Sequence, residues 1–198
     1  MHVLIIDTTT KVICLGLYSK GSYVGSHTYS NNHAAVILKE LDQLLKSKGI
    51  GLRSIEYIAM GIGPGSFSGL KISSAIVQSI MVARDIPVIT FSSMLAMALT
   101  HKANTLESEP INVITYANIN NFYVGQYRQE VSWEKLLPQV EAAQHISLNT
   151  WGDERVKQLY PQCKLLYKPL ALDSLIPYIE SHITEGKFAT VLRNTYYL

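Results

Sequence analysis

Charged residues are scarce in this chain. Asp, Glu, Lys and Arg make up 16% of its 198 residues and apolar residues make up 47%, whereas about a quarter of a typical soluble domain is charged. The net charge is +2 and the basic residues form no cluster, which excludes the basic stripe of a stand-alone nucleic-acid-binding protein. A chain of this length can bury a large core, and we expect part of the apolar excess to face a partner.

Cysteine is almost absent too. Cys14 and Cys163 are far apart and have no C-x-x-C spacing, which is typical of free thiols in a reducing compartment. The opening "MHVLIID" is too short for the apolar core of a signal peptide, and the longest apolar runs are shorter than a membrane span. The sequence therefore predicts a cytoplasmic protein without a membrane partner.

Residues that mark common metal and catalytic sites are missing from the sequence. No two of the six histidines have H-E-x-x-H or H-x-x-x-H spacing, and no serine lies in a G-x-S-x-G elbow. His33, at the start of an expected helix, is interpreted as a capping or surface residue, and the scattered acidic residues form no general acid/base pair. We therefore expect neither a metal ion nor a catalytic centre.

Strands and helices alternate through the first hundred residues. "HVLIID" is almost entirely apolar, as in a strand buried on both faces, and tight connections between the first three strands indicate an antiparallel meander. Apolar residues then recur with a helical period in "HAAVILKELDQLLKSKG", with Asn32 as the cap and Gly49 as the stop. This order predicts an α/β fold with a mixed sheet. The expected strands are 2–7, 11–19, 22–30, 55–60 and 87–91, and the expected helices are 33–49, 70–84 and 92–101.

A polar stretch, "HKANTLESEP", divides the chain. We place the boundary there, with one lobe at residues 1–103 and a smaller lobe at residues 104–198 whose end packs back on the first. The second lobe is expected to contain a hairpin with its turn at "NINN", and helices at 153–160 and 172–183. No internal repeat is visible in the sequence.

The segment "GIGPGSFSG", residues 61–69, follows an expected strand and leads into an apolar helix. Its glycines can adopt φ > 0, and its N–H groups, together with a helix start capped by Ser66 or Ser68, would suit a phosphate. It lacks the Gly-Lys-Ser/Thr ending of a Walker A loop, and no acid follows the next strand as the dinucleotide fingerprint requires. A close-packed turn from strand to helix explains the same residues, and both interpretations stay open.

An acid and hydroxyls follow the first strand, in "DTTT". Such a group can bind a metal–phosphate, and it can equally make a turn, because Asp and Thr side chains satisfy nearby backbone N–H groups. The candidate phosphate or nucleotide residues are Asp7, Thr8, Gly63, Gly65 and Ser66.

The helix expected at residues 70–84 is apolar almost all the way round. A helix of this kind has to be covered on more than one side, and the sheet covers only one. The other cover is the first helix, the second lobe or another protein, and the sequence leaves these alternatives open.

Together these segments resemble the TsaB (YeaZ) family. The resemblance rests on "LIIDTTT", "NNHAAVILKELDQLL", "GIGPGSFSGLKISSAIVQSIMVARDIPVITFSSMLAMA" and the terminal "LRN", and it is clearest in the first hundred residues. It implies the ASKHA fold, the actin-like and RNase H-like architecture, with two lobes of which the second is shortened. It also implies a non-catalytic subunit that supports a TsaD-like enzyme in transferring a threonylcarbamoyl group to adenosine 37 of tRNAs reading codons that begin with A.

The resemblance implies partners as well. They are the TsaD-like catalytic subunit, a TsaE-like P-loop ATPase, a second copy of the chain when its partner is absent, and tRNA only through the complex. ATP or ADP would be shared within that complex. The docking surface would be formed by the helices at 33–45 and 69–84. The interface residues are then His33, Ile37, Leu41, Leu45, Ile72, Ile76 and Ile80.

The sequence also departs from the family pattern. Family members usually open the second-lobe hairpin with an Asp-Ala-Arg-like stretch, whereas this chain has Tyr116-Ala117-Asn118. The rival function is an ATP-binding sugar-kinase-like enzyme, which would need a second phosphate loop and an adenosine-binding loop that the sequence does not display. A metalloprotease is disfavoured by the histidine spacing, and direct tRNA binding by the low net charge.

Overall fold

The chain forms two compact units. Unit 1 contains residues 1–93 together with the chain from residue 171 onward, and unit 2 contains residues 94–170. The boundary expected between residues 103 and 104 lies outside the described residues. None of the helices described here is long and apolar enough to cross a membrane. The residues that the computed structural model describes are 1–102, 110–128, 131–166 and 169–189.

Unit 1 is built on a five-stranded sheet, sheet A, with the strand order β3-β2-β1-β4-β5. The first three strands form an antiparallel meander, and β4 and β5 are added parallel to β1. The mixed sheet expected from the sequence is therefore confirmed. The elements of unit 1 are β1 (His2–Asp7), β2 (Val12–Ser19), β3 (Ser22–Tyr29), α1 (His33–Ser47), η1 (Leu52–Ser54), β4 (Tyr57–Gly61), α2 (Phe67–Arg84), β5 (Val88–Phe91), η3 (Leu172–Leu175) and α6 (Ile176–Thr184).

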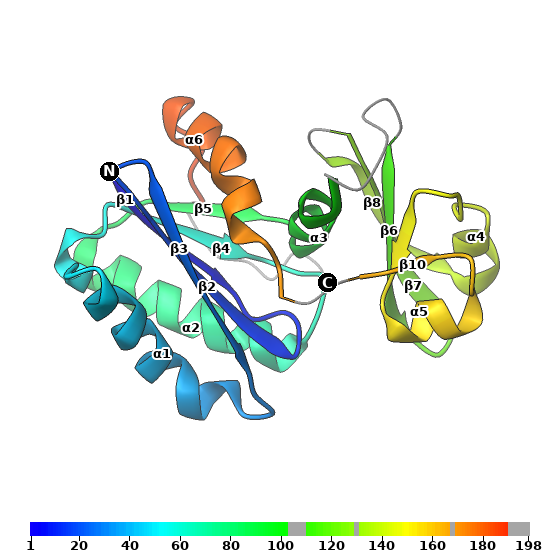
Figure 1. Ribbon diagram of the computed structural model, residues 1–198, viewed down its shortest axis with the longest axis horizontal. Coiled ribbons are helices and arrows are strands. Elements are labelled where there is room, and N and C mark those ends of the chain that lie inside the picture. Colours follow the sequence, from blue (N-terminus) through cyan, green and yellow to red (C-terminus); the bar gives the residue numbers. More distant parts are fainter. Residues whose placement is uncertain (103–109, 129–130, 167–168, 190–198) are drawn as a thin grey trace. The chain divides into compact units, whose positions relative to one another are not determined.

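Helices cover both faces of sheet A. α1 and α2 lie side by side on one face and α6 lies on the other (Figure 1). Alternate residues of β1, such as Leu4 and Ile6, pack with the apolar side of α1 and with Val77 of α2. Because the sheet is buried on both faces, β1 is a continuous apolar run rather than an alternating one.

The expected helix caps are confirmed. The Asn32 side chain accepts a hydrogen bond from the Ala35 N–H (3.2 Å) at the start of α1, and Ser66 accepts one from the Gly69 N–H (3.2 Å) at the start of α2. Gly49, with φ of +64°, follows the end of α1. The cap at Ser66 makes α2 begin at Phe67 rather than at the expected residue 70.

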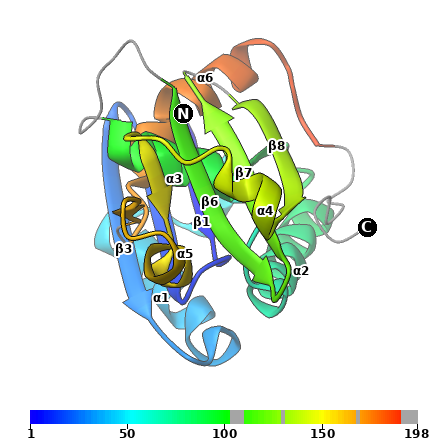
Figure 2. The same ribbon diagram turned by 90° about the vertical axis from the view of Figure 1, so that its right-hand side faces the viewer.

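Unit 2 is built on a second five-stranded sheet, sheet B, in the order β10-β9-β6-β7-β8. The expected hairpin is β6 and β7, and β8 extends it antiparallel, while β9 and β10 run parallel to β6. α4 and α5 lie on one face of the sheet (Figure 2), where Ala142 and Val156 pack against Ile114 and Phe122. The elements of unit 2 are α3 (Ser93–His101), β6 (Ile111–Asn118), β7 (Asn121–Tyr127), β8 (Val131–Pro138), α4 (Gln139–Ala143), β9 (Thr150–Gly152), α5 (Glu154–Leu159) and β10 (Lys164–Leu165).

The two sheets share one strand order. Numbered from the first strand of each unit, both have the order 3-2-1-4-5, with an antiparallel meander followed by two parallel strands. In both, one helix precedes the fourth strand and another precedes the fifth. The elements differ in length, since β9 has three residues where β4 has five. The chain therefore contains a structural repeat that the sequence did not reveal, because no residue pattern of fixed period accompanies it.

A buried histidine in unit 2 makes the stability of the protein depend on pH. His101 is 1% exposed and stacks on Trp151 with the ring centres 3.9 Å apart. Burial lowers the pKa of His101 from 6.5 to about 4. The unfolded chain therefore binds a proton between these values that the folded protein does not, and stability falls as the pH drops from 6.5 toward 4.

We expect the variant H101Q to lose this dependence. The histidine should account for about 2 kcal/mol of the fall in unfolding free energy between pH 7 and pH 5. Both tryptophans, Trp133 and Trp151, lie in unit 2, so urea unfolding followed by tryptophan fluorescence measures the effect. H27Q, at the exposed His27 on β3, is the control. Equal pH dependence in the two variants would contradict the assignment to His101.

Candidate functional site

β1 ends at a buried acidic residue, Asp7, which is fully shielded from solvent. Its Oδ1 accepts hydrogen bonds from the Thr9 N–H (2.8 Å) and the Thr9 hydroxyl (2.7 Å), and its Oδ2 accepts one from the Ser93 hydroxyl (2.6 Å). Burial raises the pKa of Asp7, and these hydrogen bonds oppose the rise. Both carboxylate oxygens are therefore engaged by donors of the chain itself.

Ser93 joins the ends of three neighbouring strands. The carboxyl ends of parallel strands meet at one edge of a sheet, so Asp7 at the end of β1, the glycine loop after β4 and Ser93 after β5 lie together. The Ser93 hydroxyl accepts a hydrogen bond from the Gly63 N–H (3.2 Å), and the Ser93 N–H donates to the Gly63 carbonyl (2.8 Å). Ser93 was not among the candidates that the sequence suggested, although its position two residues after β5, the strand next to β4, was a signal for it.

The glycines of the loop serve two purposes. Gly63 has a positive φ, +91°, as the sequence suggested for the loop glycines in general. The other three are needed for space, because a Cβ at any of them would collide with the turn after β1. The collisions would be with the Asp7 carboxylate for Gly61, with the Thr9 carbonyl for Gly65 and with the Thr8 carbonyl for Gly69.

Hydrogen bonds then tie this loop to the turn after β1. The Ser66 N–H donates to the Thr9 carbonyl (2.6 Å), and the Thr8 hydroxyl donates to the Gly69 carbonyl (2.7 Å). These groups are the donors that a phosphate would have needed. The structure thus brings the five candidate nucleotide residues together. Polar groups of four of them, Asp7, Thr8, Gly63 and Ser66, bond to Thr9, Gly69 and Ser93. This arrangement fits a close-packed turn better than a ligand cradle. In the described residues no three His, Cys, Asp or Glu side chains lie close enough to hold a metal ion.

Most of the implied interface residues face the core instead of a surface. Ile37 is 1% exposed, Leu41 and Leu45 are 6% exposed and Ile80 is 7% exposed, and His33 is buried as well. The apolar stripe of α1 packs on its own sheet, and Ile80 of α2 lies in the same core. These five residues therefore offer little surface to a partner, which counts against their part in the implied docking surface.

Another face of α2 is exposed and partly apolar. Phe67, Lys71, Ala75 and Val82 follow one another at intervals of four or seven residues and therefore share one side of the helix, which we call the outer stripe of α2. Phe67 is 46% exposed and Val82 is 90% exposed, and the Lys71 ammonium lies 4.1 Å from the centre of the Phe67 ring.

Other apolar side chains lie on the two helices. Ile72 and Ile76, which the resemblance implied, are half-buried against the core, and Leu38 of α1 is 63% exposed. The sequence could not identify the outer stripe, because a helix that is apolar on all sides gives no signal for which side faces outward.

Tyr116, which stands where family members usually carry the Asp-Ala-Arg-like stretch, contacts residues at the start of α5. The Asp153 carboxylate accepts a hydrogen bond from the Tyr116 N–H (2.7 Å), and the Arg155 guanidinium lies 4.2 Å from the centre of the Tyr116 ring. An acid and an arginine therefore do stand beside this end of β6, although they come from a different part of the sequence.

Relatives of known name are found for this chain. Over 135 residues it is 31% identical to the tRNA threonylcarbamoyladenosine biosynthesis protein TsaB of Haemophilus influenzae, a match that covers 66% of this chain and 55% of the relative. Over 127 residues it is 34% identical to the protein of the same name from Buchnera aphidicola subsp. Baizongia pistaciae, covering 63% and 57%. Residues 26–149, more than half of the chain, match the family described as TsaD, tRNA N6-adenosine threonylcarbamoyltransferase. The chain belongs to the TsaB (YeaZ) branch of the TsaD family.

The family and the fold agree. YeaZ from Pseudomonas aeruginosa has the same fold, with a TM-score of 0.78 over all of this chain and 97% of that chain at 20% sequence identity. The TsaB resemblance and the two-lobed ASKHA fold that it implied are therefore confirmed. The chain spans little more than half the length of the two curated TsaB relatives, as matched.

Proposed function

We propose that this chain is a non-catalytic subunit in the synthesis of tRNA threonylcarbamoyladenosine. In this proposal it supports a TsaD-type enzyme that modifies adenosine 37 of tRNAs reading codons that begin with A. The observation that carries the proposal is the outer stripe of α2. The core of unit 1 is already buried beneath this helix, and yet Phe67 and Val82 remain exposed, so this side of α2 is available to a partner.

The glycine loop has a supporting role in this proposal. It fixes the first turn of α2, because Ser66 caps the helix and the Thr8 hydroxyl bonds to the Gly69 carbonyl. The alternative function, an ATP-binding sugar-kinase-like enzyme, would require free donors and an accessible carboxylate at this loop. The hydrogen bonds of Asp7 and Thr8 count against it, and any ATP or ADP would be held by other subunits of the complex.

The proposed partners follow from the same surface. A TsaD-type subunit would dock on the outer stripe, and a second copy of the chain would cover the same stripe when that subunit is absent. A TsaE-type P-loop ATPase would bind the assembled complex. With a net charge of only +2, the chain would contact tRNA only as part of the complex, since independent binding depends on several phosphate contacts from Lys and Arg.

The substitution V82E tests the docking surface. Burying an unpaired carboxylate in an apolar interface is costly, so we expect V82E to weaken binding to the cognate TsaD-type protein at least about tenfold. L148E is the matched control, because Leu148 is a similarly exposed apolar residue (87%) on unit 2. Affinity would be measured by calorimetry, with circular dichroism confirming that both variants fold. Equal binding by the two variants, or no wild-type complex at micromolar concentrations, would refute the proposal.

A further inference from the structure

The first two turns of α2 place a cation on an aromatic ring. Lys71 follows Phe67 by one turn on the outer stripe, and its ammonium lies 4.1 Å from the centre of the Phe67 ring. Both side chains are exposed. The negative face of the ring attracts the ammonium, but a ring is only a weak hydrogen-bond acceptor. The three N–H donors of Lys71 therefore still need water or an acceptor from another protein.

Other cations on this side of unit 1 bond to oxygen atoms of the chain. Arg84, the second basic residue of α2, donates to the carbonyls of Leu52 (3.3 Å) and Arg53 (2.7 Å). On α1, Lys46 forms an ion pair with Asp42 (2.6 Å). Lys71 takes part in none of the ion pairs that the described residues form. Of the two cations of α2, it is the one whose charge the chain itself does not balance.

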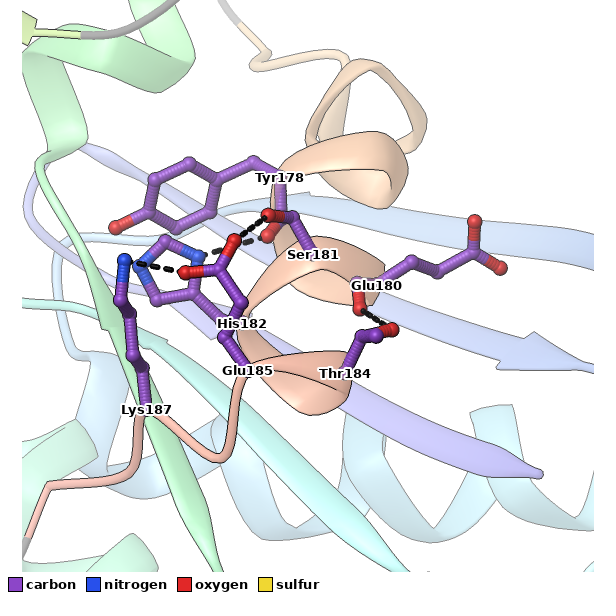
Figure 3. A network of polar contacts seen from close by, with 7 residues as sticks. All are labelled: Tyr178, Glu180, Ser181, His182, Thr184, Glu185 and Lys187. Carbon is purple, nitrogen blue, oxygen red and sulfur yellow. Dashed lines mark hydrogen bonds and ion pairs between the residues drawn. The ribbon is translucent and has the colours of Figure 1, made fainter.

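The exposed lysine beyond α6 provides a contrast. Lys187 forms an ion pair with Glu185, so its charge is neutralised within its own segment of chain (Figure 3). Its neighbour Phe188 stacks on Tyr57 at the start of β4, whereas α2 begins after the end of that strand. Lys187 is therefore a paired cation of unit 1 that lies away from the outer stripe.

Covering the Phe67 ring also covers the Lys71 ammonium, because the two are in contact. A partner that docks on the outer stripe therefore removes this charge from water. Burying an ammonium is costly unless a carboxylate pairs with it. α2 cannot supply that carboxylate, since its 18 residues include no Asp or Glu.

We propose that the partner surface on the outer stripe carries a carboxylate that pairs with Lys71, next to an apolar contact for Phe67. The inference rests on the proposed function, in which a TsaD-type subunit is this partner. Lys71 lies near one end of the stripe and the uncharged Val82 near the other. The ion pair therefore fixes which way the partner lies along α2, whereas the apolar contacts alone have no direction.

A second copy of the chain fits this end of the stripe less well. In a two-fold dimer each stripe faces the other, and a parallel pair of α2 helices would set the two Lys71 side chains against each other. An antiparallel pair would join Lys71 to Asp85 with Gln78 at the axis, since both lie seven residues from it. Phe67 would then extend past Arg84, the last residue of the other α2, and its ring would stay uncovered.

Charge reversal at Lys71 tests the pair. We expect K71E to bind the cognate TsaD-type protein at least about tenfold more weakly than the wild type at low salt, because two carboxylates would then face each other. K71M keeps an apolar side chain without the charge, and its affinity should depend less on salt than that of the wild type. K187E reverses the charge of a lysine outside the stripe and is the control. Affinity would be measured by calorimetry, with circular dichroism to confirm folding.

This inference and the proposed function fail in different ways. If V82E weakens the wild-type complex but K71E binds as tightly as K187E, the stripe is a docking surface without an acidic partner residue, and the inference is wrong. If K71E and D85N weaken only self-association in analytical ultracentrifugation, the carboxylate belongs to a second copy, which also overturns it. If the wild type forms no complex at all, the proposed function fails and the inference fails with it.

Discussion

Replacing Gly69 with alanine is expected to lower the unfolding free energy by about 3 kcal/mol or more, one of the largest effects available to a single added methyl group in this protein. The new Cβ would collide with the backbone carbonyl of Thr8. That carbonyl belongs to the turn that Thr8 and Asp7 hold in place, so it cannot move aside as a flexible side chain would. The same shift would also disturb the bond from the Thr8 hydroxyl to the Gly69 carbonyl.

The measurement is thermal or urea unfolding followed by far-ultraviolet circular dichroism. The control is G51A, because the nearest atom to a Cβ at Gly51 is 4.0 Å away and its backbone has an ordinary φ. We expect G51A to change stability by less than about 0.5 kcal/mol. If G69A were as stable as G51A, the tight packing of the glycine loop against the turn after β1 would be disproved.

Replacing Ser93 with alanine is expected to cost about 2–3 kcal/mol at neutral pH. The change removes the hydroxyl that donates to Asp7 and accepts from the Gly63 N–H, and both of those partners are buried. A buried carboxylate that loses a donor is destabilised more than a neutral group would be.

The pH dependence of this variant gives a second signature. Burial raises the pKa of Asp7 in the folded protein, so folding takes up a proton and stability rises as the pH falls toward that pKa. Loss of the Ser93 hydrogen bond raises the pKa of Asp7 further, so the cost of S93A should be greatest at high pH and shrink as the solution is acidified. Unfolding would be measured at pH 8, 7 and 5.5. S79A, which removes an exposed hydroxyl bonded to the Ala75 carbonyl, is the control, and a cost equal to that of S79A at every pH would contradict the assignment.

The sequence was sufficient to predict the first sheet, because burial there produces clear patterns of apolar residues. β1 is a continuous apolar run, α1 has a single apolar stripe, and Asn32 and Ser66 are recognisable caps. The second sheet was only partly predicted. β9 and β10 contain three and two residues, and segments of that length are specified by their neighbours in space and not by a local pattern.

The candidate site, too, was predicted only in part. The sequence brought Asp7, Thr8 and the glycine loop together correctly, since they follow adjacent parallel strands. It could not show that their polar groups bond within the protein to Thr9, Gly69 and Ser93, because that depends on how closely the glycine loop packs against the turn after β1. For the docking helices the sequence could not distinguish the buried side from the exposed one, since the most regular apolar stripe is the one that the protein buries in its own core.

The return of the chain to unit 1 has a consequence for synthesis on the ribosome. Sheet A receives η3 and α6 only after every residue of unit 2 has been made, and η3 contacts both β2 and β3. A nascent chain that has emerged through residue 170 therefore contains all of unit 2. Its unit 1 still lacks η3 and α6, so one apolar face of sheet A is uncovered. During that interval the exposed apolar face makes the nascent chain prone to aggregation and a target for chaperones.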